Sequence, residues 1–250
     1  MKKFELTNEV MELGGKTLYR IRALRAIGTN VEAGDLGGWL EKDSNLSQEG
    51  DAWVYGDAKV YGNAKVYGNA WVCGDAEVCG NAKVYGNAWV CGNAKVYGNA
   101  KVYGDAKVYG DTEVCGNAWV YGDAEVCGDA GVCGNAKVCG NAKVYGNAWV
   151  CGNAKVYGNT KVYGNAEVCG NAEVCISSDI LTIGPIGSRN GTTTFYRTKD
   201  SKIFVKCGCK NADIDTWLAM VKETHGDNKH AQAYRLAAEI ARLQILGEKA

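Results

Sequence analysis

One hexapeptide, Gly-(Asn/Asp)-Ala-X-Val-(Tyr/Cys), repeats without interruption from Gly50 to Cys175. There are 21 copies in 126 residues, and the fifth position is Val in every copy. The third position is Ala except at Thr112 and Thr160. A fixed period of this kind is typical of repeat proteins in which each unit packs against its neighbours. It therefore constrains the fold more than any other feature of the 250-residue chain.

Each hexapeptide has the chemistry of a short strand followed by a corner. Ala and Val lie two residues apart, so in an extended chain they point to one side, and X and Tyr or Cys point to the other. Val and Tyr favour strands, whereas Gly, Asn and Asp favour turns. Because one hexapeptide cannot bury its apolar side alone, the strands are expected to stack around a narrow core of Ala and Val.

The repeat resembles that of the hexapeptide-repeat proteins of the left-handed β-helix superfamily, in which three hexapeptides form one triangular coil. The resemblance implies a mainly β fold, a left-handed parallel β-helix of about 7 coils from the 21 copies. The segments Leu36-Gly37-Gly38-Trp39, Asn45-Leu46-Ser47 and Gly50-Asp51-Ala52-Trp53-Val54-Tyr55 resemble the entry into bacterial and phage members of this group. Most of those proteins are uncharacterised, so the resemblance informs architecture more than function.

The chain divides into three parts by composition. Residues 1–49 are expected to form an N-terminal hairpin cap with its turn at Gly14-Gly15, and residues 50–175 the hexapeptide-repeat β-helix. Residues 176–250 leave the repeat and carry 11 Lys and Arg against 8 Asp and Glu. Their pattern predicts a small C-terminal α+β domain of three strands and two helices.

The two expected helices have recognisable ends. Asp213 is expected to cap the first helix, and Gly226 to end it. Asp227 is expected to cap the second helix. Three apolar residues of the second helix are expected to face inward: Leu236, Ile240 and Leu243.

The loop from Gly184 to Gly191 is the strongest candidate for ligand binding. Its glycines free backbone N–H groups, and a Ser and an Arg side chain add donors that suit phosphate or carboxylate. The candidate ligand- or anion-binding residues are Gly187, Ser188, Arg189 and Gly191. An ordinary β-turn is the alternative. Because the next strand follows at once, the loop is neither a dinucleotide fingerprint nor a P-loop.

If three repeats make one coil, every third repeat lies on the same face. A candidate protein-binding face, called here the Trp row, consists of Trp53, Trp71 and Trp89. The alternative for these residues is aromatic stacking along the strands. A basic and aromatic face, called here the Lys/Tyr face, suits a phosphate backbone with stacked bases. It consists of Lys65, Lys83, Lys101, Lys137, Lys155, Tyr67, Tyr85, Tyr103 and Tyr121.

Ten of the 12 cysteines occupy the sixth repeat position, which they share with 11 tyrosines. Four would lie on consecutive coils of one face: Cys115, Cys133, Cys151 and Cys169. Parallel side chains are expected to hold neighbouring Cβ atoms too far apart for a disulfide, and the chain shows no signal peptide, so we expect reduced thiols. A straight row of thiols does not make a tetrahedral site. Cys207-Gly208-Cys209 with His225 and His230 lacks the usual zinc spacing, so we expect no metal and no cofactor.

These features predict a non-enzymatic binding or scaffold protein, by resemblance a phage or prophage accessory protein. It would act through a face of the rod or the C-terminal unit, as an inhibitor that captures a host protein or a nucleotide-like ligand, and self-association is a further expectation. Acyltransferase activity and nucleic-acid binding through the Lys/Tyr face are the alternatives. The first is disfavoured because the repeat contains no His. The second is disfavoured because 28 Lys and Arg balance 28 Asp and Glu.

The location follows from what the sequence lacks. No apolar run approaches the ~18 residues of a membrane span, and no signal peptide follows Met1-Lys2-Lys3. We therefore expect a cytoplasmic protein with no membrane partner, in the host cytoplasm if the chain is phage-encoded.

Overall fold

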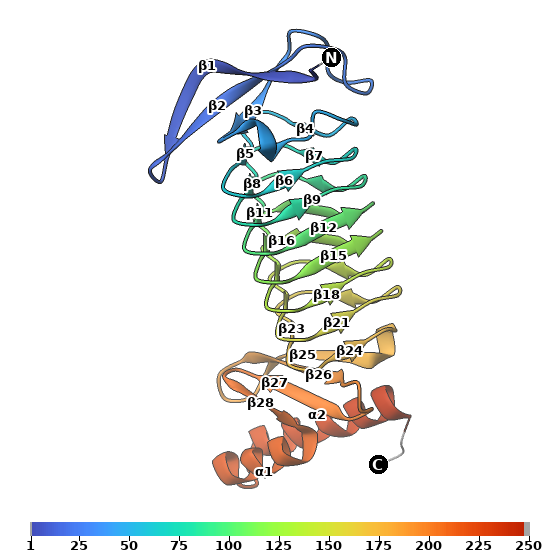
Figure 1. The fold of residues 1–250 in the computed structure, drawn as a ribbon. Helices are drawn as coiled ribbons and strands as arrows, with labels where there is room; N and C mark the ends of the chain where they lie inside the picture. The colour runs from blue at the N-terminus through green and yellow to red at the C-terminus, as the bar shows by residue number, and fades with distance from the viewer. Residues whose placement is uncertain (1, 248–250) are drawn as a thin grey trace.

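The computed structural model describes residues 2–247 and is elongated along one axis (Figure 1). A hairpin of β1 (Phe4–Leu13) and β2 (Lys16–Ala23) projects at one end, with its turn at Gly14-Gly15 as predicted. Stacked short strands form the body, and a sheet with two helices closes the other end. The structure confirms the predicted mainly β solenoid with a small C-terminal unit of sheet and helices.

The strands of the repeat stack into three parallel sheets, one for each face of the solenoid. The first face consists of β4 (Trp53–Val54), β7 (Trp71–Val72), β10 (Trp89–Val90), β13 (Lys107–Gly110), β16 (Glu125–Gly128), β19 (Lys143–Val144) and β22 (Lys161–Val162). The second consists of β5 (Lys59–Val60), β8 (Glu77–Val78), β11 (Lys95–Val96), β14 (Glu113–Val114), β17 (Gly131–Val132), β20 (Trp149–Val150) and β23 (Glu167–Val168). The third consists of β6 (Lys65–Val66), β9 (Lys83–Val84), β12 (Lys101–Gly104), β15 (Trp119–Gly122), β18 (Lys137–Val138), β21 (Lys155–Val156) and β24 (Glu173–Val174).

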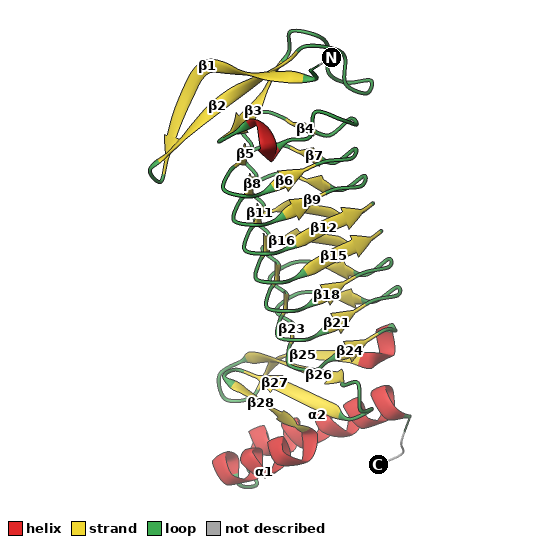
Figure 2. Cartoon of the chain, viewed as in Figure 1, coloured by secondary structure: helices red, strands yellow, loops and turns green. Residues whose placement is uncertain are grey.

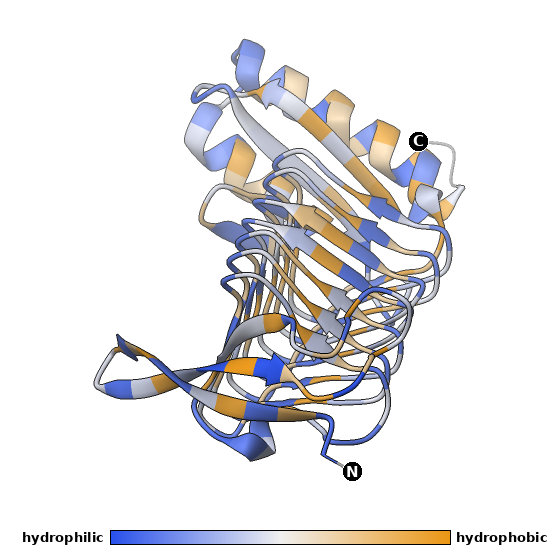
Figure 3. Ribbon diagram, turned by 90° about the horizontal axis from the view of Figure 1, so that it is seen from above, coloured by the Kyte–Doolittle hydropathy of each residue, from blue (hydrophilic) through white to orange (hydrophobic). Residues whose placement is uncertain are grey.

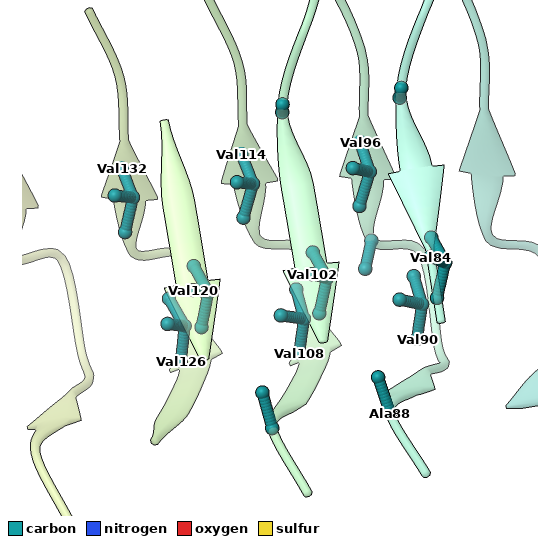
Figure 4. Close-up of a cluster of buried hydrophobic side chains, with 14 of the residues drawn as sticks. Val84, Ala88, Val90, Val96, Val102, Val108, Val114, Val120, Val126 and Val132 are labelled. Atoms are coloured by element: carbon teal, nitrogen blue, oxygen red, sulfur yellow. The ribbon is translucent and has the colours of Figure 1, made fainter. Parts of the chain in front are cut away.

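The register confirms the 18-residue coil. Trp53 pairs with Trp71, and Trp71 pairs with Trp89, so each strand lies beside the strand three repeats away. The inward Val and Ala residues form continuous columns (Figure 4), in which Val84, Val102 and Val120 follow one another on successive coils. Viewed from above with residues coloured by hydropathy, hydrophobic and hydrophilic residues alternate along each coil (Figure 3).

The solenoid begins before the repeat, which adds one turn to the seven that were expected. β3 (Leu36–Leu40) pairs in parallel with β5, and Leu46, just after η1 (Asp43–Asn45), bridges Val66. Leu40 and Leu46 are buried, and each lies beside the inward Val of the next coil. The two glycines of the Leu-Gly-Gly-Trp element permit this stacking, because a Cβ at Gly37 would lie 2.6 Å from a carbonyl oxygen of the next coil.

One disulfide corrects the expectation of fully reduced thiols. Cys73 and Cys91 are bonded across neighbouring coils, with their Cα atoms 4.5 Å apart. Parallel strands in exact register bring the two Cα atoms to the short end of the range that disulfides use. At this position the two side chains therefore approach closely enough to bond, contrary to the expectation for parallel side chains.

The C-terminal unit is an antiparallel sheet covered by two helices (Figure 2). Its strands follow the chain in order: β25 (Ile180–Ile186), β26 (Gly191–Arg197), β27 (Ile203–Cys207) and β28 (Lys210–Asp213). β28 was not predicted, because four residues with one apolar side chain show no alternation. The unit follows η2 (Ser177–Asp179) and docks on the last coil, where the backbone N–H of Glu167 donates to Thr194 Oγ1 at 3.2 Å.

Helix α1 (Ile214–His225) has the predicted ends. The Asp213 carboxylate accepts the N–H of Thr216 at 3.0 Å, and Gly226 ends the helix with a φ of 57°. Helix α2 (Lys229–Leu246) corrects the predicted cap, because the Asn228 side chain accepts the N–H groups of His230 and Ala231. Asp227 instead forms an ion pair with Arg235.

The buried face of α2 is also different from the predicted one. The expected inward residues are exposed: Leu236 by 60%, Ile240 by 50% and Leu243 by 58%. The face against the sheet carries mainly small residues instead: Ala231, Tyr234, Ala237, Ala238, Ala241 and Ile245. Alanines allow close approach of the helix to the sheet, and Leu236, Ile240 and Leu243 lie on the exposed side. Neither helix in residues 2–247 is long and apolar enough to cross a membrane.

Candidate functional site

A cleft of about 560 Å³ lies in the C-terminal unit, beside the last coil. Two hairpin segments line it, Ser188–Thr192 and Cys207–Lys210. Residues of α1, Tyr234 of α2, and Asn165 and Glu167 of the solenoid complete the lining. The volume falls within the range of about 300–1,000 Å³ that is typical of small-molecule sites.

The aromatic wall of the cleft is held rigidly. Trp217 is buried, and its ring stands nearly perpendicular to Phe195 and to Tyr234, with centroid separations of 5.4 Å and 5.2 Å. The Cys207 thiol donates to the Tyr234 hydroxyl at 3.8 Å. Burial raises the pKa of Tyr234 to about 12, so the hydroxyl keeps its proton at neutral pH and can donate to a ligand.

Three of the four predicted loop residues line this cleft: Ser188, Arg189 and Gly191. Ser188 and Arg189 lie in the tight turn between β25 and β26, and Gly191 begins β26. Gly187 has a φ of 78° and lies beneath Tyr234, where a Cβ atom would be 1.8 Å from the hydroxyl oxygen. Gly187 therefore shapes the cleft by making room for the Tyr234 side chain. Neither Trp217 nor Tyr234 was among the site residues that the sequence predicted.

The charge of the cleft favours an anion. Glu167 forms an ion pair with Lys206 at 3.0 Å, which offsets its negative charge. Burial acts to lower the pKa of Lys206, but the hydrogen bond with Glu167 and the charges nearby together outweigh burial and raise the pKa, so the pair stays charged. Arg189 and Lys210 form no ion pair with any side chain of residues 2–247. Two cations thus remain available in the cleft.

Some residues of the zinc set considered above meet in the same cleft. Cys207, Cys209 and His225 all line it, and the rings of His225 and His230 lie 5.9 Å apart. Within the part of the chain that the structure describes, no three His, Cys, Asp or Glu side chains are grouped so as to hold a metal ion.

The Trp row is only partly exposed. Trp53 is fully buried and meets Phe4 of the hairpin edge-on, at a centroid separation of 6.4 Å. Trp71 and Trp89 stack at 6.1 Å, and Trp89 is 50% exposed. Any binding surface on this row therefore begins at Trp71, because Trp53 belongs to the core beneath the cap.

The predicted residues of the Lys/Tyr face do lie on one face. Tyr67, Tyr85, Tyr103 and Tyr121 form a parallel stack with separations of 4.8, 4.8 and 5.0 Å. The five lysines occupy successive strands, interrupted by one tryptophan. Trp119 lies between Lys101 and Lys137, whose ammonium groups are 4.4 and 4.8 Å from its ring centre.

One border of the Lys/Tyr face is an uninterrupted row of asparagines. Each side-chain amide donates to the next asparagine, from Asn63 to Asn171, over distances of 3.0–3.4 Å. Amide ladders satisfy their own donors and acceptors and carry no charge. Acidic corner residues therefore border this face on one side only, at Asp105 and Asp123.

The comparison with known families concerns the repeat. The model of the YdcK β-solenoid repeat family matches residues 58–74 and 136–152, both inside the hexapeptide region. A search of curated proteins gives no significant match to the chain. The match and the stacked parallel sheets agree on the architecture. The chain is a β-solenoid repeat protein whose repeat is similar to that of YdcK.

Proposed function

We propose that the protein is a non-enzymatic binding protein that captures a small, nucleotide-like ligand in its C-terminal cleft. The observation that carries this proposal is the combination of unpaired cations and aromatic rings in one cleft. Arg189 and Lys210 would hold the anionic group, and the Trp217–Tyr234 wall would contact a planar ring. The rod then acts as a rigid support for the cleft.

The resemblance at the entry to the repeat supports a more specific setting. Leu36-Gly37-Gly38-Trp39 forms the first turn of the solenoid, which suits the bacterial and phage hexapeptide proteins of the left-handed β-helix superfamily that this element resembles. In that setting, the protein would be a phage or prophage accessory protein in the host cytoplasm. Capture of a nucleotide signal would make it an inhibitor of the process that the signal controls.

Native mass spectrometry tests the proposal on protein purified without a chelator. We expect a retained mass in the range of a nucleotide, which is lost in Arg189→Ala and kept in Arg25→Ala, a change at a partly exposed arginine of the cap. Titration calorimetry with nucleoside mono-, di- and cyclic phosphates would then identify the class. The proposal fails if the protein carries only its polypeptide mass and none of these compounds binds.

The Lys/Tyr face supports a second candidate function, the binding of single-stranded nucleic acid. The observation in its favour is the neutral asparagine border, which runs beside the strands of Lys83, Lys101, Lys137 and Lys155. Fluorescence anisotropy with a labelled oligonucleotide tests it. Binding should weaken at least tenfold when Lys83 and Lys101 are both changed to Glu, and should not respond to Arg189→Ala.

A further inference from the structure

The cysteines of the repeat fall into two classes according to their neighbours on adjacent coils. Residues 18 positions apart lie side by side on neighbouring strands, as the Cys73–Cys91 disulfide shows. Four repeat cysteines have only tyrosine as a repeat neighbour: Cys79, Cys127, Cys139 and Cys175. The other four free cysteines of the repeat follow one another on consecutive coils: Cys115, Cys133, Cys151 and Cys169.

The last two cysteines of this row are the closest free pair. Their Sγ atoms are 2.6 Å apart, not far above the bonded distance of about 2.05 Å. β20 and β23, which precede them, pair in register, and the N–H of Cys151 donates to Val168 O at 2.9 Å. This is the same backbone relation that joins Cys73 and Cys91, whose strands β7 and β10 are also in register.

The first two cysteines of the row form a second pair. Cys133 is more affected by burial than by any neighbour, and burial with the adjacent thiols raises its pKa to about 11. β14 and β17, which precede Cys115 and Cys133, pair in register, and the N–H of Cys115 donates to Val132 O at 2.9 Å. Cys133 and Cys151 have the same backbone relation, but the Cys151 thiol is already in contact with Cys169. The row therefore divides into Cys115–Cys133 and Cys151–Cys169.

We propose that Cys151–Cys169 and Cys115–Cys133 are oxidisable dithiols that form a second and a third disulfide across neighbouring coils. The oxidant is a small-molecule disulfide such as oxidised glutathione. One thiolate of a pair attacks a sulfur of the oxidant and releases one thiol. The second cysteine then displaces the other thiol, so the protein loses two hydrogens and two molecules of reduced thiol are formed.

The Cys151–Cys169 pair lies in the two coils nearest the C-terminal unit. Glu167, two residues before Cys169, holds Thr194 through its backbone N–H and Lys206 through its carboxylate. A disulfide at this position would tie the coil that carries the ligand cleft to the coil before it. Oxidation would therefore reinforce the junction between rod and cleft.

Counting thiols tests the proposal. The protein is incubated with oxidised glutathione, unfolded in urea, treated with iodoacetamide and weighed. Three disulfides leave six of the 12 cysteines to react, whereas the Cys73–Cys91 disulfide alone leaves ten. Six adducts are expected, rising to 12 after complete reduction. Ten adducts after oxidation would overturn the proposal.

The pairing has its own readout. Trypsin separates Cys151, in peptide 144–155, from Cys169, in peptide 162–189, so their disulfide joins two peptides. Cys151→Ser should remove this joined peptide and give seven adducts. Cys127→Ser, at an isolated cysteine, should keep it and give five. A joined peptide linking Cys133 to Cys151 would contradict the division into pairs.

Discussion

The hydroxyl group of Tyr234 leaves room only for a glycine at residue 187, because a Cβ atom on Gly187 would lie 1.8 Å from Tyr234 Oη. The two residues come from different elements, the β25–β26 turn and helix α2. Their contact sets the shape of the cleft at the point where the hairpin turn meets the helix. The absent side chain of a glycine thus determines where an aromatic residue of the site can lie.

Gly187→Ala is expected to displace Tyr234 and weaken ligand binding at least tenfold. The added methyl group also places a non-glycine residue at a φ of 78°, which costs about 1–2 kcal/mol. Thermal unfolding and titration with the retained ligand measure the two effects separately. Gly28→Ala is the control, since Gly28 lies in the cap, has a positive φ of 56°, and its Cβ would meet nothing within 4 Å. Equal effects of the two changes would contradict this account.

The corner glycines provide a second prediction about the rod itself. A Cβ at Gly104 would lie 2.9 Å from the backbone nitrogen of Gly122, whereas a Cβ at Gly164 would meet nothing within 4 Å. Both residues have positive φ, so Gly164→Ala reports the backbone cost alone. Gly104→Ala should destabilise the protein by about 1–3 kcal/mol more, because the coils must separate locally. Urea unfolding followed by circular dichroism measures the difference.

The architecture was predictable because every repeat has the same pattern of turn-forming and strand-forming residues. The corner glycines, the inward Ala and Val and the 18-residue period all require the same stacking. The additional first turn was harder to predict, because Leu40 and Leu46 perform the role of Val without the hexapeptide spacing. Only contact with the next coil identifies them as part of the solenoid.

The candidate site was only partly predictable. Ser188 and Arg189 were found through loop chemistry, which is local in the sequence. Tyr234 could not be found, because its role depends on which face of α2 meets the sheet. That face was predicted wrongly: the size of Leu236 and Ile240 suggested burial, but close packing against the sheet selected alanines.

Alkaline pH is expected to destabilise the reduced protein. The pKa of Cys133 is raised to about 11, mainly by burial. The pKa of Tyr121 is raised to about 12 by a hydrogen bond with Cys139 and by burial. In the unfolded chain the same groups ionise near about 8.5 and 10. Above those values the unfolded state has lost protons that the folded state keeps, so stability is complete below about pH 8.5 and falls as pH rises.

Urea unfolding at a series of pH values from 7.5 to 10.5, with a reducing agent, measures this decline. Cys133→Ala should make the decline shallower, whereas Cys209→Ala, at an exposed position, should leave it unchanged. Lys3 has the opposite effect on the pH dependence of stability. Burial lowers its pKa to about 8, so its contribution to stability increases between about pH 8 and 10.4, and Lys3→Met should make the decline steeper. If Cys133→Ala and Lys3→Met both leave the slope of unfolding free energy against pH unchanged, both assignments are wrong.

The Trp row separates a structural role from a binding role. Trp53 is buried against Phe4, so Trp53→Ala should cost about 3–5 kcal/mol and loosen the hairpin cap. Trp89 is half exposed and stacks on Trp71, so Trp89→Ala should cost only about 0.5–1.5 kcal/mol. Urea unfolding followed by circular dichroism gives both values. If a protein partner uses this row, its affinity should fall in Trp89→Ala, which stays folded, and should be unchanged in Arg189→Ala. The reverse pattern would assign the partner to the C-terminal cleft.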